Sequence, residues 1–154
     1  MTYTLRQSTE DDFAFCYRIC KENMHDLFCR HWGGWVDEEF KKGFKIPDIK
    51  IIAVNDSPIG YFDCEFTETH IHINNIQISA SMQGKGIGTR VLNQFVSLHR
   101  DKRIILTVFE DNPAKRIYVR LGFSVYHKQG GTIKMELPAQ QGDAPEPLTR
   151  PGDR

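Results

Sequence analysis

The chain has 154 residues, which is enough for one domain of ordinary size and too few for two substantial ones. Hydrophobic residues make up 40% of it and charged residues 26%, which excludes a wholly disordered, collagenous or coiled-coil chain. Lysine and arginine together number 20, as do aspartate and glutamate, so the net charge is zero and no extended nucleic-acid surface is expected.

Neither membrane association nor a bound metal is expected. No apolar run approaches the roughly 20 residues that a bilayer-spanning helix needs, and residues 1–7 lack the charged-then-apolar layout of a signal peptide. We therefore expect a cytoplasmic protein whose cysteines are reduced thiols in the core. The cysteines do not show the close, repeated spacing of a zinc module with the nearby histidines. They are Cys16, Cys20, Cys29 and Cys64.

The first half of the chain predicts a strand, two helices and a hairpin. Thr9, three residues before Asp12, resembles a capping box that opens a helix, and apolar side chains then recur at spacings of three and four. Two later runs of β-branched and aromatic residues flank the turn at 55–58 and predict a hairpin. The expected elements are a strand at 3–7, helices at 10–29 and 37–42, and strands at 50–54 and 59–66.

The second half predicts an alternation of strands and helices. Asn112 and Pro113 suit the start of a helix, and Gly122 suits its end. The other expected elements are a strand at 70–79, a helix at 87–99, a strand at 103–109, and a closing hairpin of 124–127 and 132–137. The order β-α-α-β-β-β-α-β-α-β-β predicts the mixed α/β class, with a six- to seven-stranded mixed sheet flanked by helices.

The end of the chain differs in composition from the rest. Residues 138–154 hold four prolines and no aromatic side chain, so they cannot bury a core. We expect a single domain over residues 1–137 and a flexible tail over residues 138–154.

The strand at 70–79 changes the phase of its alternation. Ile71 and Ile73 are apolar at odd positions, whereas Ile76 and Ile78 are apolar at even positions. One extra residue, a β-bulge at Asn74–Asn75, restores the alternation and leaves backbone groups unpaired for an extended ligand with amide groups. The alternative is a strand covered by helices on both faces, which need not alternate.

A glycine-rich loop leads directly into the predicted helix at 87–99. Its glycines allow several backbone N–H groups to approach one ligand, and the helix N-terminus adds unpaired donors, as a pyrophosphate site requires. Lys85 adds a positive charge. No Gly-Lys-Ser/Thr follows as in a P-loop, and Thr89 stands where a dinucleotide fingerprint needs its third glycine. A plain helix-entry turn is the alternative. The loop residues are Gln83, Gly84, Lys85, Gly86, Ile87 and Gly88.

Two segments together resemble the GNAT N-acetyltransferase superfamily. The strand residues 76–78, followed by the loop 83–88, are similar to its strand and Gln/Arg-x-x-Gly-x-Gly/Ala signature. The segment 112–123 is similar to its second landmark, a helix with asparagine, alanine and tyrosine that ends in Gly-Phe. The resemblance extends over about residues 3–137 and leaves the tail unexplained.

The resemblance implies acetyl-CoA as the donor and a primary amine of a small molecule or peptide as the acceptor, joined by direct attack in a ternary complex. Backbone amides of residues 83–88 would hold the pyrophosphate, and Ile76 and Ile78 would pair with the pantetheine arm. Asn112 would contact that arm, and Tyr118 would act as general acid. No metal is implied, and a homodimer is the assembly to test. The alternatives are a CoA-binding sensor without turnover and, more remotely, a nucleotide-binding α/β protein.

The general base departs from the family pattern. Many members carry a carboxylate on the corresponding strand, but residues 70–75 contain neither aspartate nor glutamate. His72, whose ordinary pKa is near 6.5, and Glu65 on the neighbouring strand are the candidates. An ordinary surface role for either is the alternative.

The acceptor site is expected at the connection between the first two helices. Trp32 and Trp35 with the acidic run 37–39 would suit a cationic amine. The alternative is that the tryptophans pack on the sheet and the acids favour a helix N-terminus.

Overall fold

The computed structural model of this chain describes residues 2–140. Residues 141–154, which include most of the predicted tail, lie outside the described part, so the division into a domain and a flexible tail stays a prediction. Within the described residues, no helix is both long enough and apolar enough to cross a membrane.

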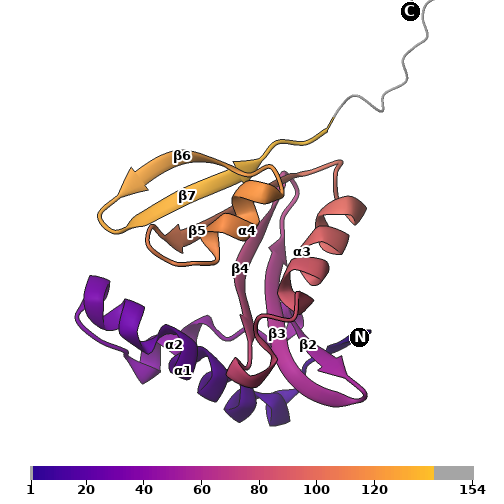
Figure 1. Ribbon diagram of the computed structural model, residues 1–154, viewed down its shortest axis with the longest axis vertical. Coiled ribbons are helices and arrows are strands. Elements are labelled where there is room, and N and C mark those ends of the chain that lie inside the picture. Colours follow the sequence, from indigo (N-terminus) through magenta and orange to yellow (C-terminus); the bar gives the residue numbers. More distant parts are fainter. Residues whose placement is uncertain (1, 141–154) are drawn as a thin grey trace, which may run out of the picture.

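A single seven-stranded mixed sheet forms the centre of the fold (Figure 1). Its strand order is β1-β2-β3-β4-β5-β7-β6, and neighbouring strands are antiparallel except for β4 and β5, which are parallel. This confirms the predicted mixed α/β class. The strands are β1 Thr4–Gln7, β2 Ile49–Val54, β3 Ser57–Phe66, β4 His70–Ile78, β5 Arg103–Phe109, β6 Ser124–Gln129 and β7 Thr132–Leu137.

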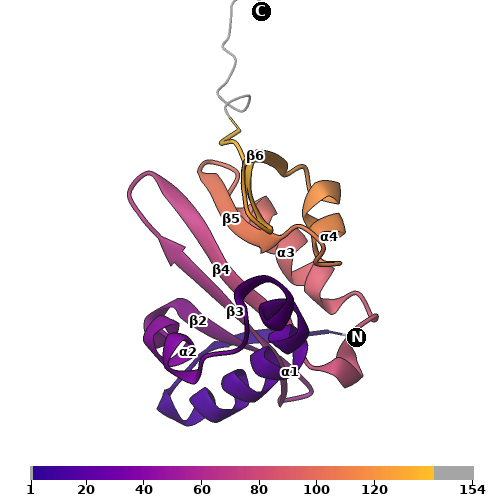
Figure 2. The same cartoon turned by 90° about the vertical axis from the view of Figure 1, so that its left-hand side faces the viewer.

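Helices cover both faces of the sheet (Figure 2). The predicted first helix begins with a 3-10 turn, η1, and then runs three residues further than expected, to a left-handed Gly33. The capping box is present: the Thr9 backbone N–H donates to Asp12 Oδ2 over 2.8 Å. The helices are η1 Glu10–Asp12, α1 Phe13–Trp32, α2 Asp37–Gly43, η2 Ile46–Asp48, η3 Ala80–Met82, α3 Ile87–Leu98 and α4 Lys115–Arg120.

Each face of the sheet has its own apolar core. The larger core packs the sheet against α3 and α4, and the smaller one packs β2 and β3 against α1. Three of the cysteines belong to these cores, and Cys29 is exposed. Burial raises the pKa of Cys16 and of Cys64 to about 12, so both thiols stay protonated at neutral pH and serve as small apolar side chains.

The predicted bulge in β4 is present. Asp63 of β3 pairs with Asn75 and the next residue, Cys64, pairs with Ile73, so Asn74 is the extra residue. On its other side, β4 pairs with β5 only from His70 to Ile73. Residues 74–78 therefore have no strand partner on that side, and an opening forms between the two parallel strands.

Gly60 lies where β3 and β4 approach each other closely. A Cβ atom built there would stand 2.2 Å from the backbone oxygen of Gln77 and 3.1 Å from the side chain of Ile78. Backbone cannot move aside as a flexible side chain can, so only glycine lets the two strands pair at this point.

We expect Gly60→Ala to lower the free energy of unfolding by about 1–3 kcal/mol, because β3 must move away from β4. The matched control is Gly43→Ala at the end of α2, where an added Cβ meets nothing within 4 Å. Urea denaturation of both variants measures the difference. Equal stability of Gly60→Ala and the unmodified chain would contradict this close approach.

Candidate functional site

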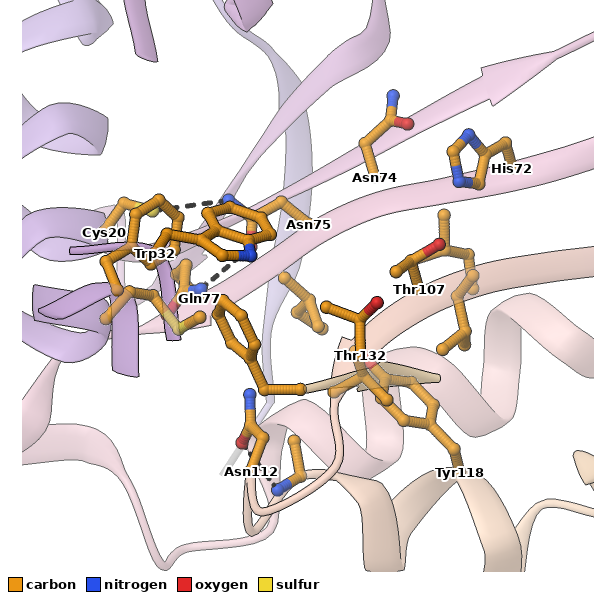
Figure 3. Close-up of a pocket in the computed structure, with 18 residues that line it drawn as sticks. Cys20, Trp32, His72, Asn74, Asn75, Gln77, Thr107, Asn112, Tyr118 and Thr132 are labelled. Carbon is orange, nitrogen blue, oxygen red and sulfur yellow. Dashed lines mark hydrogen bonds between the residues drawn. The ribbon is translucent and has the colours of Figure 1, made fainter. Parts of the chain in front are cut away.

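Three cavities follow one another along the opening beside β4. The loop groove, about 730 Å3, lies between the 83–89 loop and α4. The central chamber, about 290 Å3, lies between β4 and β5 (Figure 3). The aromatic cavity, about 700 Å3, lies between α1, α2 and the strands β3 and β4. The groove shares Ile76, Gln77 and Tyr118 with the chamber, and the chamber shares Trp32 and Asn75 with the aromatic cavity, so the three adjoin one another.

The loop groove ends at a helix N-terminus with free donors. Gly84 and Gly86 have φ of 80° and 82°, a left-handed conformation that glycine adopts without strain. The first hydrogen bond of α3 runs from Arg90 N to the Gly86 carbonyl over 3.0 Å, and no side chain of the described residues caps the helix. The N–H groups of residues 87–89 therefore point out of the helix at the positive end of its dipole, as an anion site requires.

The edge of β4 supplies backbone groups to the groove. Ser79 N donates to the Ile59 carbonyl of the neighbouring strand over 2.8 Å. Because antiparallel pairing alternates, the backbone groups of Ile76 and Ile78 face the opening instead. The Ile78 carbonyl already accepts bonds from Asn23 Nδ2 and Gln83 Nε2, both at 2.9 Å. Of the two residues predicted to pair with a ligand, Ile76 therefore offers its backbone N–H and carbonyl, and Ile78 offers its N–H.

Positive charge reaches the loop groove from α4. Lys85, the predicted cation, is exposed and does not line the groove. Arg116 and Arg120 line it instead, and no salt bridge among residues 2–140 involves either of them. These arginines are not among the predicted binding residues. The sequence could have indicated them, because residues four apart in a predicted helix lie on the same face.

Asn112 and Tyr118 lie where the loop groove meets the chamber. Asn112 Oδ1 accepts a bond from Ala114 N over 2.9 Å, which fixes the turn into α4 (Figure 3). Tyr118 is 6% exposed, and burial raises its pKa to about 12, so its hydroxyl keeps its proton at neutral pH. Among the described residues this hydroxyl has no hydrogen-bond partner, which is unusual for a buried polar group.

His72 and Glu65, the predicted base candidates, are direct neighbours across β3 and β4. His72 is half-buried and lines the chamber (Figure 3), whereas Glu65 is exposed and lines the aromatic cavity. Burial lowers the pKa of His72, and the nearby charge of Glu65 opposes that shift. His72 is therefore neutral at pH 7 and can accept a proton.

Asp63 is a further carboxylate near the site that is not among the predicted site residues. It is 7% exposed and lines the aromatic cavity, next to Asn75 in the strand pairing. Burial raises its pKa to about 6, with further contributions from the charges of Asp48 and Glu65. The sequence could have indicated Asp63, because it stands two residues before Glu65 in a predicted strand and residues two apart point to the same face.

Side-chain amides connect α1 to the bulged strand. Asn23 Nδ2 donates to Gln77 Oε1 over 3.0 Å, and Gln77 Nε2 donates to Asn75 Oδ1 over 2.8 Å. Asn75 Nδ2 in turn donates to the Tyr61 hydroxyl over 2.9 Å. Between them these residues line all three cavities, and each bonded side chain restricts the position of the next.

The aromatic wall comes from the end of α1 and the segment that follows it. Trp32 is 60% exposed, and its ring lies 4.8 Å from that of Phe109 in β5. His31 fixes this end of α1, because its ring stacks on Phe109 at 4.7 Å and its Nε2 lies 2.7 Å from Asp111 Oδ1. The C-terminal turn of α1 is thus attached to the strand and loop on the far side of the chamber.

Only part of the predicted acidic run lines this cavity. Asp37 accepts bonds from Trp35 Nε1 and the Tyr17 hydroxyl, both at 2.8 Å, and Glu38 pairs with Lys41. Glu39 alone of the three lines the aromatic cavity, together with both tryptophans.

Comparisons with known proteins agree with this geometry. The model of the acetyltransferase (GNAT) family matches residues 7–123. No curated protein matches significantly. Among solved structures, PaiA N-acetyltransferase of Thermoplasma acidophilum in complex with coenzyme A is 16% identical, with a TM-score of 0.68 over 88% of this chain and 98% of that one.

Two further structures share the fold. The ribosomal-protein-S18-alanine N-acetyltransferase of Escherichia coli is 18% identical, with a TM-score of 0.70 over 97% of this chain and 100% of that one. Arabidopsis thaliana Naa50 in complex with the bisubstrate analogue CoA-Ac-MVNAL is 14% identical, with a TM-score of 0.61 over 89% of this chain and 99% of that one. Since the family model spans most of the chain, the protein belongs to the GNAT acetyltransferase family and is an acyltransferase.

Proposed function

We propose that the protein transfers an acetyl group from acetyl-CoA to a primary amine by direct attack within a ternary complex. The observation that carries this proposal is the central chamber itself. It adjoins the loop groove on one side and the aromatic cavity on the other, and it is lined by a buried tyrosine whose hydroxyl has no hydrogen-bond partner among residues 2–140.

The residues of the loop groove fit coenzyme A. Free N–H groups of residues 87–89, with the preceding loop from Gln83, suit the pyrophosphate. Arg116 and Arg120 add charge for phosphate, which guanidinium groups bind well. The backbone groups of Ile76 and the N–H of Ile78 can bond the amides of the pantetheine arm, with Asn112 at the entrance to the chamber.

The proposed reaction balances with two side chains. The amine nitrogen forms a bond to the thioester carbonyl carbon, and the carbon–sulfur bond then breaks. A backbone N–H of the β4 edge can stabilise the negative oxygen between these events. Before the attack, the ammonium passes one proton to His72, which releases it to solvent. The departing thiolate takes its proton from the Tyr118 hydroxyl, and the second proton of the attacking nitrogen, lost as the amide forms, replaces it on Tyr118.

His72 is supported as the base by its location and its pKa. It lines the same chamber as Tyr118, whereas Glu65 lines the neighbouring cavity. Because burial lowers its pKa, His72 is neutral at pH 7 before the amine is deprotonated, as a general base must be. In this proposal Glu65, directly opposite in the strand pairing, stabilises the positive charge that His72 gains.

We expect Tyr118→Phe to lower kcat by about 100-fold, because the thiolate loses its proton donor. Affinity for CoA should change little, since the ring and its packing against Phe123 are retained. Thiol release and calorimetry with CoA measure the two quantities separately. Unchanged kcat would remove Tyr118 from the mechanism. CoA binding without acetylation of any amine by the unmodified chain would favour a sensor module.

We expect kcat of the unmodified protein to fall as pH decreases through the pKa of His72, which burial places below 6.5. Tyr118 should add no loss below about pH 10, because its pKa is about 12. His72→Gln should lower kcat about 100-fold and remove the acidic limb of the profile. His70→Gln, two residues away and outside the chamber, is the matched control. An unchanged acidic limb in His72→Gln would exclude His72 as the base.

A further inference from the structure

The aromatic cavity has an excess of negative charge. Its acidic and basic lining residues are four carboxylates and one ammonium group. Lys45, the ammonium, donates to the Lys42 carbonyl over 3.1 Å and pairs with none of these carboxylates. No salt bridge within the described residues involves any of the four. The carboxylates are Glu39, Asp48, Asp63 and Glu65.

Asp63 is the buried member of this group, and its hydrogen bonding is incomplete. Oδ1 accepts one bond, from Asn74 Nδ2 over 3.2 Å, and no described residue donates to Oδ2. Buried carboxylates in proteins are normally paired or bonded by several donors. An ammonium group in the cavity would supply both the missing donors and the opposite charge.

Aromatic rings form the opposite wall of the cavity. Trp35 packs between Phe28 and Phe40, with ring centroids at 5.2 and 5.8 Å, and Trp32 packs on Phe28 at 4.9 Å. All four rings line the cavity. Such a wall can cover the methylene groups of an aliphatic ligand and can attract a cation through its ring faces.

The position of Asp63 determines with which ammonium group of a ligand it can pair. The amine that reacts must enter the chamber, where Tyr118 and His72 lie, and it must lose its proton there. Asp63 lines the aromatic cavity and not the chamber, although its strand neighbour Asn75 lines both. An ammonium paired with Asp63 is therefore a different one from the amine that is acetylated.

We propose that the aromatic cavity binds an aliphatic di- or polyamine, with Asp63 pairing with the ammonium group that does not react. This proposal rests on the proposed acetyltransferase function and names its acceptor class. One end of the acceptor reaches the chamber past Trp32 and Asn75. Its methylene chain lies on the aromatic wall, and the second cation meets the carboxylates.

The test compares two acceptors of equal length, 1,4-diaminobutane and n-pentylamine, in which a methyl group replaces the second ammonium. For the unmodified protein, we expect kcat/KM to be about 30-fold higher for the diamine, as expected for a buried charge pair. In Asp63→Asn the preference should fall to about 3-fold or less, because the remaining carboxylates are more exposed. Equal rates for both amines, or a preference retained in Asp63→Asn, would overturn the proposal.

A binding measurement keeps this result separate from the proposed function. Calorimetry with CoA present reports the affinity of each amine without turnover. If CoA binds and neither amine is acetylated, the proposed reaction fails, yet tighter binding of the diamine than of pentylamine still supports the acceptor class. Similar affinities for both amines would reject that class even if acetylation is observed.

Asp63→Asn should fold at least as well as the unmodified chain. Because burial raises the pKa of Asp63 to about 6, the folded state favours the protonated form, and stability falls as pH rises through that value. Asparagine cannot ionise, so the variant should melt at a higher temperature at pH 7. Glu38 pairs with Lys41 outside the cavity, so Glu38→Gln is the control for loss of a carboxylate and should keep the diamine preference.

Discussion

The separation of β4 from β5 after Ile73 and Leu106 is the constraint on which the site depends. Up to that pair the two strands share parallel hydrogen bonds, and beyond it β4 keeps β3 on one edge but has no strand among the described residues on the β5 side. The extra residue Asn74 turns the strand at this point, because a bulge adds local twist and bend. The groove and the chamber both occupy the space created there, and the helix N-terminus at Gly86 stands at its end.

An open strand edge needs support, and α1 provides it. Asn23 bonds both Gln77 and the Ile78 carbonyl, so the helix holds β4 from one face while β3 pairs with its other edge. At its far end the same helix is attached through His31 to Phe109 and Asp111. One helix thus contacts both sides of the opening, β4 at one end and the end of β5 at the other.

The features predicted from sequence are those that depend on a few consecutive residues. The bulge at Asn74 follows from a change in alternation, and the left-handed loop follows from the glycines at 84 and 86. Asp63 could not be placed in the aromatic cavity, because its burial depends on α1 and α2 packing over β3. The amides of Asn23 and Gln77 are 54 residues apart, and no local pattern relates them. Helix α1 extends beyond the end predicted from its apolar periodicity, because its last turn packs on Phe109 of β5.

The aromatic wall also has an optical consequence. The chain contains two tryptophans, Trp32 and Trp35, and both line the aromatic cavity. The entire indole emission of the native protein therefore originates at the walls of one cavity. A molecule that displaces water from those rings changes the wavelength and the quantum yield of this emission, so the protein carries an intrinsic fluorescent reporter of whether this cavity is occupied.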